Sequence, residues 1–187
     1  MSLILFNKPF GVLSQFSDHP THSTLANYID APGVYPAGRL DVDSEGLMLL
    51  TDNGKLQHDI SHPEMGKLKM YLVQVEGLPN SEQLGRLMQP IKLGDFTTRG
   101  SRAVRIEPPG WLWSRDPPVR ERKHIPTSWL AVTISEGKNR QVRRMTAAVG
   151  LPTLRLIRSA IGPFSLHTHP LLPGEWRTVS EEEWKGN

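Results

Sequence analysis

Cysteine is absent from the 187-residue sequence, which excludes disulfides, thiolate metal sites and cysteine nucleophiles. Long apolar runs are lacking as well. The run Leu47-Met48-Leu49-Leu50 is far shorter than the roughly 20 apolar residues of a membrane-spanning helix. The N-terminus shows no basic segment followed by an apolar stretch, so no secretory signal is visible. We therefore expect a cytoplasmic protein that does not bind a membrane.

Acidic residues are scarce between residues 99 and 158. This segment has 13 of the 22 basic residues and only 4 of the 19 acidic residues, which leaves 9 basic and 15 acidic residues elsewhere. A positive block beside a negative remainder is typical of a surface that binds a polyanion. A solvated arginine-rich surface is the alternative, and charge by itself does not choose between the two.

Strands and helices are expected to alternate without a regular repeat, which favours the α+β class. Apolar runs and alternation predict strands at residues 3–6, 46–51, 70–76, 102–106, 130–134, 154–157 and 176–179. Capping residues and glycine breaks predict helices at about residues 24–29, 54–60, 81–88 and 140–149. Leu84, Leu87 and Met88 are expected on one face of the third helix. Residues 33–38 and the proline-rich stretch 108–126 are expected to be loops, and a loop as long as the second is often functional.

The segment 38–47 holds Asp41, Asp43 and Glu45 beside Arg39 in a loop bounded by glycines. The acidic spacing partly matches a calcium-binding EF-hand, but the preceding residues include Pro36 and cannot form the entering helix. An acidic solvated turn is a second interpretation. A third is a catalytic loop, because loops held by adjacent strands often carry reactive side chains. Spacing does not choose between the last two.

Four segments of the chain, in order, resemble the motifs of the RsuA-type RNA pseudouridine synthases. They are residues 7–14 (NKPFGVLS), 38–51 (GRLDVDSEGLMLLT), 69–77 (KMYLVQVEG) and 136–145 (EGKNRQVRRM). Parts of the C-terminal region, residues 154–158, 161–162 and 174–177, fit the family too. Together these segments cover nearly the whole chain, so coincidence is a poor explanation.

The resemblance implies a pseudouridine synthase fold with a mixed, mostly antiparallel central sheet and flanking helices. We expect a single catalytic domain over residues 1–187, with lobes of about 1–65 and 66–187 around a cleft. Family members usually carry an S4-like RNA-binding domain, and none is expected here. The segment 111–123 resembles an insertion of the RluE branch, which lacks that domain and acts on large-subunit ribosomal RNA. That RNA (23S) is the expected partner, and the protein is expected to be a monomer.

Pseudouridylation breaks the N1–C1′ bond of uridine, rotates the uracil and rejoins it through C5, so no cofactor and no metal is expected. The resemblance implies that Asp41 is the catalytic carboxylate and that Arg143 keeps it ionised against burial. Tyr71 would stack on the extruded base, with Val142 packing on its other side. Arg39 and Leu40 complete the expected substrate site.

A further set of basic residues is expected to bind RNA. Arg140 and Arg144 are four residues apart and align on one helix face, with Arg143 beside them. The simple interpretation turns Arg143 into the site and turns the others, with Lys138, toward phosphate. The loop residues Arg120, Arg122 and Lys123 join this set, beside Arg115, Trp111 and Trp113 in a composition that suits structured RNA. Alternatively, the tryptophans anchor the loop to the body of the protein.

The histidine pairs His19/His22 and His58/His62 have ligand-like spacing but no obvious third ligand, so surface histidines are expected. A non-catalytic RNA-binding protein and a ribosome-assembly factor remain as alternatives to an enzyme. The joint presence of Asp41, Tyr71 and Arg143 favours the enzyme, because an inert relative would be expected to lose at least one of them.

Overall fold

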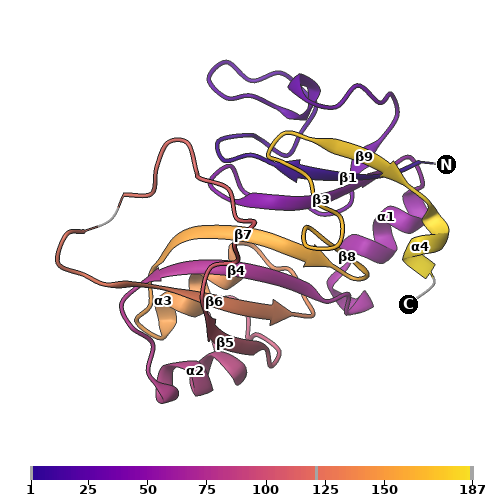
Figure 1. Ribbon diagram of the computed structural model, residues 1–187. Helices are drawn as coiled ribbons and strands as arrows, with labels where there is room; N and C mark the ends of the chain where they lie inside the picture. The colour runs from indigo at the N-terminus through magenta and orange to yellow at the C-terminus, as the bar shows by residue number, and fades with distance from the viewer. Residues whose placement is uncertain (1, 121, 186–187) are drawn as a thin grey trace.

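The computed structural model describes residues 2–120 and 122–185, whose strands form one nine-stranded sheet (Figure 1). Seven strands follow each other in the order β5-β6-β4-β7-β3-β1-β9, while β2 pairs with β3 and β8 with β7. The strands are β1 (Leu3–Lys8), β2 (Tyr35–Pro36), β3 (Glu45–Thr51), β4 (Lys69–Glu76), β5 (Arg102–Ile106), β6 (Thr127–Ile134), β7 (Thr153–Ile161), β8 (Phe164–Ser165) and β9 (Trp176–Val179). The α-helices of this part of the chain are α1 (Gly54–Ser61), α2 (Ser81–Met88), α3 (Gln141–Ala148) and α4 (Glu181–Lys185). Short 3-10 turns cover Leu25–Asn27 and Pro63–Met65.

The sheet is mixed and mostly antiparallel, which confirms the predicted fold class. The exception is the parallel pair β3–β7, which is only two residues long and joins Glu45 to Ile157 and Gly46 to Arg158. Gly46 has a φ of +106°, and a Cβ built on it would lie 2.3 Å from the carbonyl oxygen of Arg158. Only glycine allows this close approach. The two halves of the sheet therefore meet at Gly46, next to Glu45, within the segment 38–47 that holds the three acidic residues (the carboxylate segment).

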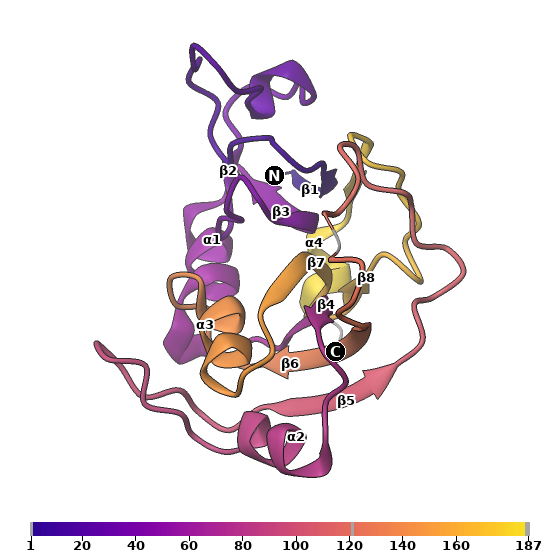
Figure 2. The same ribbon diagram turned by 90° about the vertical axis from the view of Figure 1, so that its left-hand side faces the viewer.

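Both faces of the inner strands β1, β3, β4 and β7 are largely buried, because strand alternation sends successive apolar side chains into two separate clusters. On β3, Met48 and Leu50 belong to a cluster that includes Val142 and Met145 of α3. Leu47 and Leu49 belong to a second cluster with residues of α1 and with Trp184 of α4. Figure 2 shows the same elements from the end of the sheet at which α3 lies.

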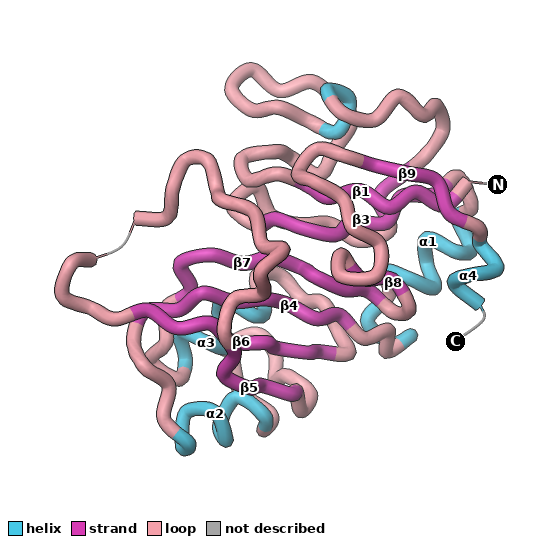
Figure 3. The backbone as a smooth tube through the Cα atoms, viewed as in Figure 1, coloured by secondary structure: helices cyan, strands magenta, loops and turns pink. Residues whose placement is uncertain are grey.

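Several elements differ from the sequence-based expectations. The strand β2 lies within the stretch 33–38 that was expected to be a loop, and neither β8 nor α4 was predicted. Met88 does not share the buried face of α2: it is 42% exposed at the last turn, whereas Leu87 is fully buried. The last strand, β9, pairs with β1, so the two halves of the sheet are not consecutive pieces of sequence divided at about residue 65. Figure 3 shows the long loop between β5 and β6, as expected.

Candidate active site

A cavity of about 610 Å³ opens between the carboxylate segment, the start of α3 and the strands β4 and β7. Seven of the predicted site residues line it: Arg39, Leu40, Asp41, Tyr71, Lys138, Arg140 and Val142. These residues come from three of the four motifs. The tertiary structure therefore brings together segments separated by about a hundred residues.

Backbone contacts hold the carboxylate segment in place. The hydroxyl of Ser14 donates to the carbonyl of Leu40 at 2.6 Å and accepts from the amide of Leu40 at 3.1 Å. The amide of Gly11 donates to the carbonyl of Val42 at 2.8 Å. The N-terminal motif thus holds the residues on either side of Asp41 by hydrogen bonds. This gives a structural reason why the N-terminal motif occurs together with the carboxylate motif.

Arg140 makes the ion pair to Asp41. Its Nη1 lies 3.3 Å from Oδ2 of Asp41, and its two terminal nitrogens donate to the carboxylate of Asp43 at 3.1 and 2.9 Å. Arg143 instead donates from Nη2 to the backbone carbonyl of Asp43 at 2.7 Å, and the same nitrogen lies 3.5 Å from the Asp43 carboxylate.

These contacts differ from the interpretation that turned Arg143 toward Asp41 and Arg140 toward phosphate. The physical reason is the backbone of Arg140, which precedes α3 in the left-handed conformation at φ 48°. A helical periodicity does not apply to a residue outside the helix, so the alignment of Arg140 with Arg144 was not a sound guide. Arg143 is half-shielded beneath the carboxylate segment, and its role in catalysis stays a prediction.

Opposing effects set the charges of the segment. Burial raises the pKa of Asp43, but the hydrogen bond from Arg140 and the charges of Arg143 and Arg140 outweigh it, so the pKa of Asp43 is lowered. Hydrogen bonding to Asp43 raises the pKa of Arg140. Fully buried Lys8 lies near the same carboxylates, and burial lowers its pKa to about 7 although Glu45, Asp43 and Asp41 oppose the shift. Asp43 thus remains ionised at neutral pH and lies within ion-pair distance of both arginines.

The floor of the cavity is formed by one face of the sheet. Lys69 and Tyr71 of β4 are two residues apart, and so are Leu156 and Arg158 of β7, so each pair shares a face. Tyr71 and Arg158 are direct partners across the two strands. Lys69 and Arg158 were not among the predicted site residues. The strand alternation around Tyr71 would have identified Lys69, whereas Arg158 lies in the segment 154–158 that fits the family but is paired with Tyr71 only through the register of the sheet.

The loop between β5 and β6 is anchored on the opposite face of the sheet. The indole of Trp113 donates to Glu45 at 2.9 Å, and Arg155 donates to the carbonyl of Trp113 at 3.0 Å and twice to Glu45 at 2.8 Å. The alternative in which the tryptophans anchor the loop is therefore confirmed for Trp113. The guanidinium of Arg115 lies over the ring of Phe10 at 4.3 Å and donates to two carbonyls of its own loop.

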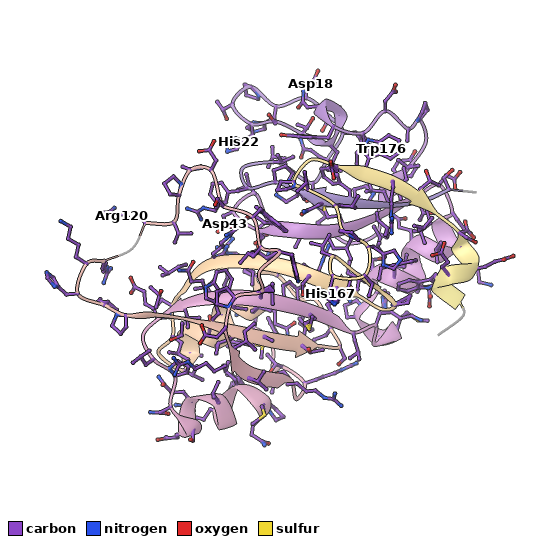
Figure 4. The ribbon with its side chains drawn as sticks, in the orientation of Figure 1. Asp18, His22, Asp43, Arg120, His167 and Trp176 are labelled. Carbon is purple, nitrogen blue, oxygen red and sulfur yellow. The ribbon has the colours of Figure 1, made fainter. Side chains whose placement is uncertain are left out.

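The outer part of this loop carries the exposed cations. It extends beyond the end of the sheet at which β3 and β7 begin (Figure 1). Figure 4 shows Arg120 far out on the loop, well away from Asp43. Arg120 and Lys123 are exposed, while Arg122 forms a loose pair with Glu76 at 3.4 Å.

Arg144, which was predicted to face phosphate, is instead engaged by groups of the protein itself. Its Nη2 donates to the carbonyl of Leu93 and to the carboxylate of Asp95, and its guanidinium lies 4.8 Å from the ring centre of Phe96. Lys138 lies over the same ring at 5.0 Å. Arg144 lies on the side of α3 that faces the hairpin at residues 92–97, and it does not line the cavity. It therefore braces a hairpin and is a poor candidate for a phosphate contact.

The histidine pairs form no metal site. His19 and His22 contact each other edge to face at 5.1 Å, and His58 stacks on His62 at 4.6 Å. Across residues 2–120 and 122–185, no group of three or more His, Asp or Glu side chains is placed to hold a metal ion. Within those same residues, no helix has the length and apolar character needed to cross a membrane.

Comparisons with known proteins agree with the motifs and the cavity. A family model described as RNA pseudouridylate synthase matches residues 2–148. The "Ribosomal large subunit pseudouridine synthase E" of Xanthomonas campestris is 56% identical over 177 residues, which are 94% of each chain. The protein of the same name from Vibrio vulnificus is 51% identical over 95% of this chain and 75% of its own. A solved structure described as a pseudouridylate synthase superimposes with a TM-score of 0.80 at 28% identity, over 98% of this chain and 72% of the other.

The resemblance of the four motifs to RsuA-type enzymes is thereby confirmed, as is the similarity to the RluE branch. Each of the four motifs that carried the resemblance contributes residues to the lining of the cavity. The chain belongs to the RNA pseudouridylate synthase family, and it is a pseudouridine synthase, an isomerase.

Proposed function

We propose that this enzyme isomerises a uridine of large-subunit (23S) ribosomal RNA, with Asp41 as the catalytic carboxylate. The relatives that are 56% and 51% identical over nearly the whole chain bear the name of large-subunit enzymes, which supports this substrate. The observation that carries the catalytic assignment is that Asp41 and Tyr71 line the same cavity. An enzyme with this substrate would work in the cytoplasm, where ribosomal RNA is found.

The cavity suits a nucleotide that has been rotated out of its stack. C1′ and C5 are inaccessible inside a helix, so the target must be extruded before the glycosidic bond is cut. Tyr71 offers a nearly buried aromatic face for the base, a contact that contributes about 1–3 kcal/mol. Buried Val142 lines the cavity as well and would pack on the other side of the ring. Asp41, half-buried and paired with Arg140, would then face the sugar.

The exposed cations around the mouth would bind the RNA backbone. Arg39, Lys138 and Arg140 are exposed and line the cavity, so they would meet the phosphates beside the extruded nucleotide. Arg120, Arg122 and Lys123 lie farther out on the loop between β5 and β6 and would reach a more distant part of a folded RNA. The isomerisation changes no oxidation state and transfers no phosphoryl group, so these side chains need no cofactor.

A carbodiimide assay tests the proposal. Ribosomal RNA that lacks the modification is incubated with the protein, labelled with carbodiimide and mapped by mass spectrometry. Wild type is expected to create one new pseudouridine in 23S RNA, and Asp41→Asn is expected to create none. The matched control is Asp18→Asn, an exposed aspartate outside the cavity, which should act like wild type.

Three outcomes would overturn part or all of the proposal. Wild-type activity in Asp41→Asn would remove the carboxylate from the reaction. A wild-type protein that binds 23S RNA yet forms no pseudouridine in it would favour the non-catalytic alternatives. New pseudouridine in 16S RNA instead would reassign the substrate.

A further inference from the structure

Two buried cations form part of the cavity floor. Lys69 is 5% exposed and Arg158 is 3% exposed, and both line the cavity. The Nζ of Lys69 donates to the carbonyl of Lys67 at 3.2 Å, and the Nε of Arg158 donates to the carbonyl of Leu47 at 2.8 Å. Among the residues that the structure describes, no carboxylate forms an ion pair with either side chain, and the Nη2 of Arg158 has no hydrogen-bond partner.

Such an arrangement is unfavourable unless something else satisfies it. Buried charges in proteins are normally paired, and buried polar N–H groups are normally hydrogen-bonded. Burial is the main cause that lowers the pKa of Lys69 to about 8, and the neighbouring positive charge of Arg158 lowers it further. An acceptor oxygen entering the cavity would relieve both the unpaired N–H and the repulsion between the two cations.

The register of the sheet indicates which part of a nucleotide would meet these cations. Arg158 is the cross-strand partner of Tyr71, and Lys69 lies two residues before Tyr71 on the same face. A base that stacks on the Tyr71 ring therefore turns its edge toward Lys69 and Arg158. The phosphates stay with the RNA at the mouth of the cavity, beside the exposed cations Arg39 and Arg140.

We propose that Lys69 and Arg158 bind a carbonyl oxygen of the extruded uracil and stabilise the negative charge that the ring acquires when its bond to C1′ breaks. This inference rests on the proposed function. When the N1–C1′ bond breaks, its electron pair passes to the uracil, where it is shared between N1 and the carbonyl oxygens. The new C5–C1′ bond uses an electron pair of the ring, one proton leaves C5 and one proton binds N1. The product is thus an isomer of the substrate, and only the intermediate ring is anionic.

The inference predicts a loss of rate without an equal loss of RNA affinity. The variants are Lys69→Met, which removes a charge, and Arg158→Gln, which keeps a donor for the Leu47 carbonyl. Single-turnover pseudouridine formation is measured on an RNA fragment that carries the uridine modified by wild type. Because a hydrogen bond to a charged group is lost, each variant is expected to be about 10- to 100-fold slower, with RNA binding changed by less than about threefold. Lys67→Met, outside the cavity, is the matched control and should keep the wild-type rate.

A sulfur substitution in the RNA separates direct contact from a structural effect. The same fragment is made with 2-thiouridine or 4-thiouridine at the target, because sulfur accepts hydrogen bonds poorly. Wild type should slow on the thio-RNA whose oxygen is contacted, and the Lys69 and Arg158 variants should show little further loss on that RNA. If Arg158→Gln melts below the assay temperature, Lys69→Met alone carries this comparison.

The outcomes distinguish this inference from the proposed function. Wild-type rates in both variants, or equal losses in rate and affinity, would overturn the role of the floor cations while leaving the enzyme assignment intact. Rate losses that add to the thio effect on both thio-RNAs would also overturn it. Failure of wild type to modify any uridine of 23S RNA would instead overturn the proposed function.

Discussion

Removing one partner of the pair Glu45–Arg155 is expected to destabilise the fold strongly, because it would leave the other charge buried without its ion-pair partner. The side chains are 1% and 6% exposed. Arg155 donates to both carboxylate oxygens of Glu45 at 2.8 Å, and Trp113 adds a third hydrogen bond at 2.9 Å. Arg155→Met would remove two of these three hydrogen bonds. The buried charge of Glu45 would keep only the hydrogen bond from the Trp113 indole. Breaking a buried pair in this way costs about 3–5 kcal/mol.

That free energy corresponds to a large thermal shift. A domain of this size loses roughly 2–4 °C in Tm per kcal/mol, so Arg155→Met should melt roughly 6–20 °C below wild type. The double variant Glu45→Met with Arg155→Met should recover most of the loss, because an apolar pair of similar volume is often as stable as a buried ion pair. The exposed pair of Arg122 with Glu76 is the control: Arg122→Met should change stability by about 0–1 kcal/mol.

Urea and thermal unfolding followed by circular dichroism measure these differences for wild type, the two single variants and the double variant. Fluorescence of Trp113 and the other tryptophans reports whether the loop between β5 and β6 is released. A Tm of Arg155→Met within about 2 °C of wild type would refute the reasoning, since it would mean that leaving Glu45 buried without its guanidinium partner costs almost nothing. Strict additivity of the two single changes in the double variant would refute it too, because residues in direct contact should couple.

Three further predictions concern pH, RNA binding and turnover. Burial lowers the pKa of Lys8 to about 7, so folded Lys8 loses its proton near pH 7 while the unfolded lysine keeps it to about pH 10. The buried charge of Lys8 therefore destabilises the fold fully below pH 7 and progressively less toward pH 10. Urea unfolding should show that wild type gains stability relative to Lys8→Met between pH 7 and pH 10. A difference in unfolding free energy that stays constant with pH would contradict this. Replacing Arg120 and Lys123 by alanine should lower the slope of log Kd for RNA against log salt concentration by about 1–2. The control Lys55→Ala, at an exposed lysine, should leave this slope unchanged. An unaltered slope in the Arg120 and Lys123 variant would show that the loop does not belong to the RNA interface. Arg143→Ala should slow tritium release from labelled RNA by about 10- to 100-fold, because the carbonyl of Asp43 loses a charged donor. The RNA affinity measured by filter binding should fall much less. Equal losses in rate and affinity would count against a catalytic role.

Local sequence determined most of the elements and the chemical character of the site. Alternation around Tyr71, the Asp-Asn-Gly turn before α1 and the glycine after α3 are short-range features, and the strands and helices appear where they predicted them. The motifs also identified Asp41 and Tyr71, which line one cavity. Met88 shows the limit of this approach, because a helix face read from periodicity does not say where the packing against the sheet ends.

Only the tertiary structure decided which side chains contact one another in and around the site. Arg140 reaches Asp41 because its backbone adopts a left-handed conformation, and Arg144 is engaged with a hairpin that lies about fifty residues away in sequence. Lys69 and Arg158 meet at the cavity floor through the register between β4 and β7, which no local pattern contains. Periodicity is a property of one segment, whereas ion pairs and cavity walls depend on how distant segments are packed, and so the sequence determined the residues of this site while the fold determined which of them meet.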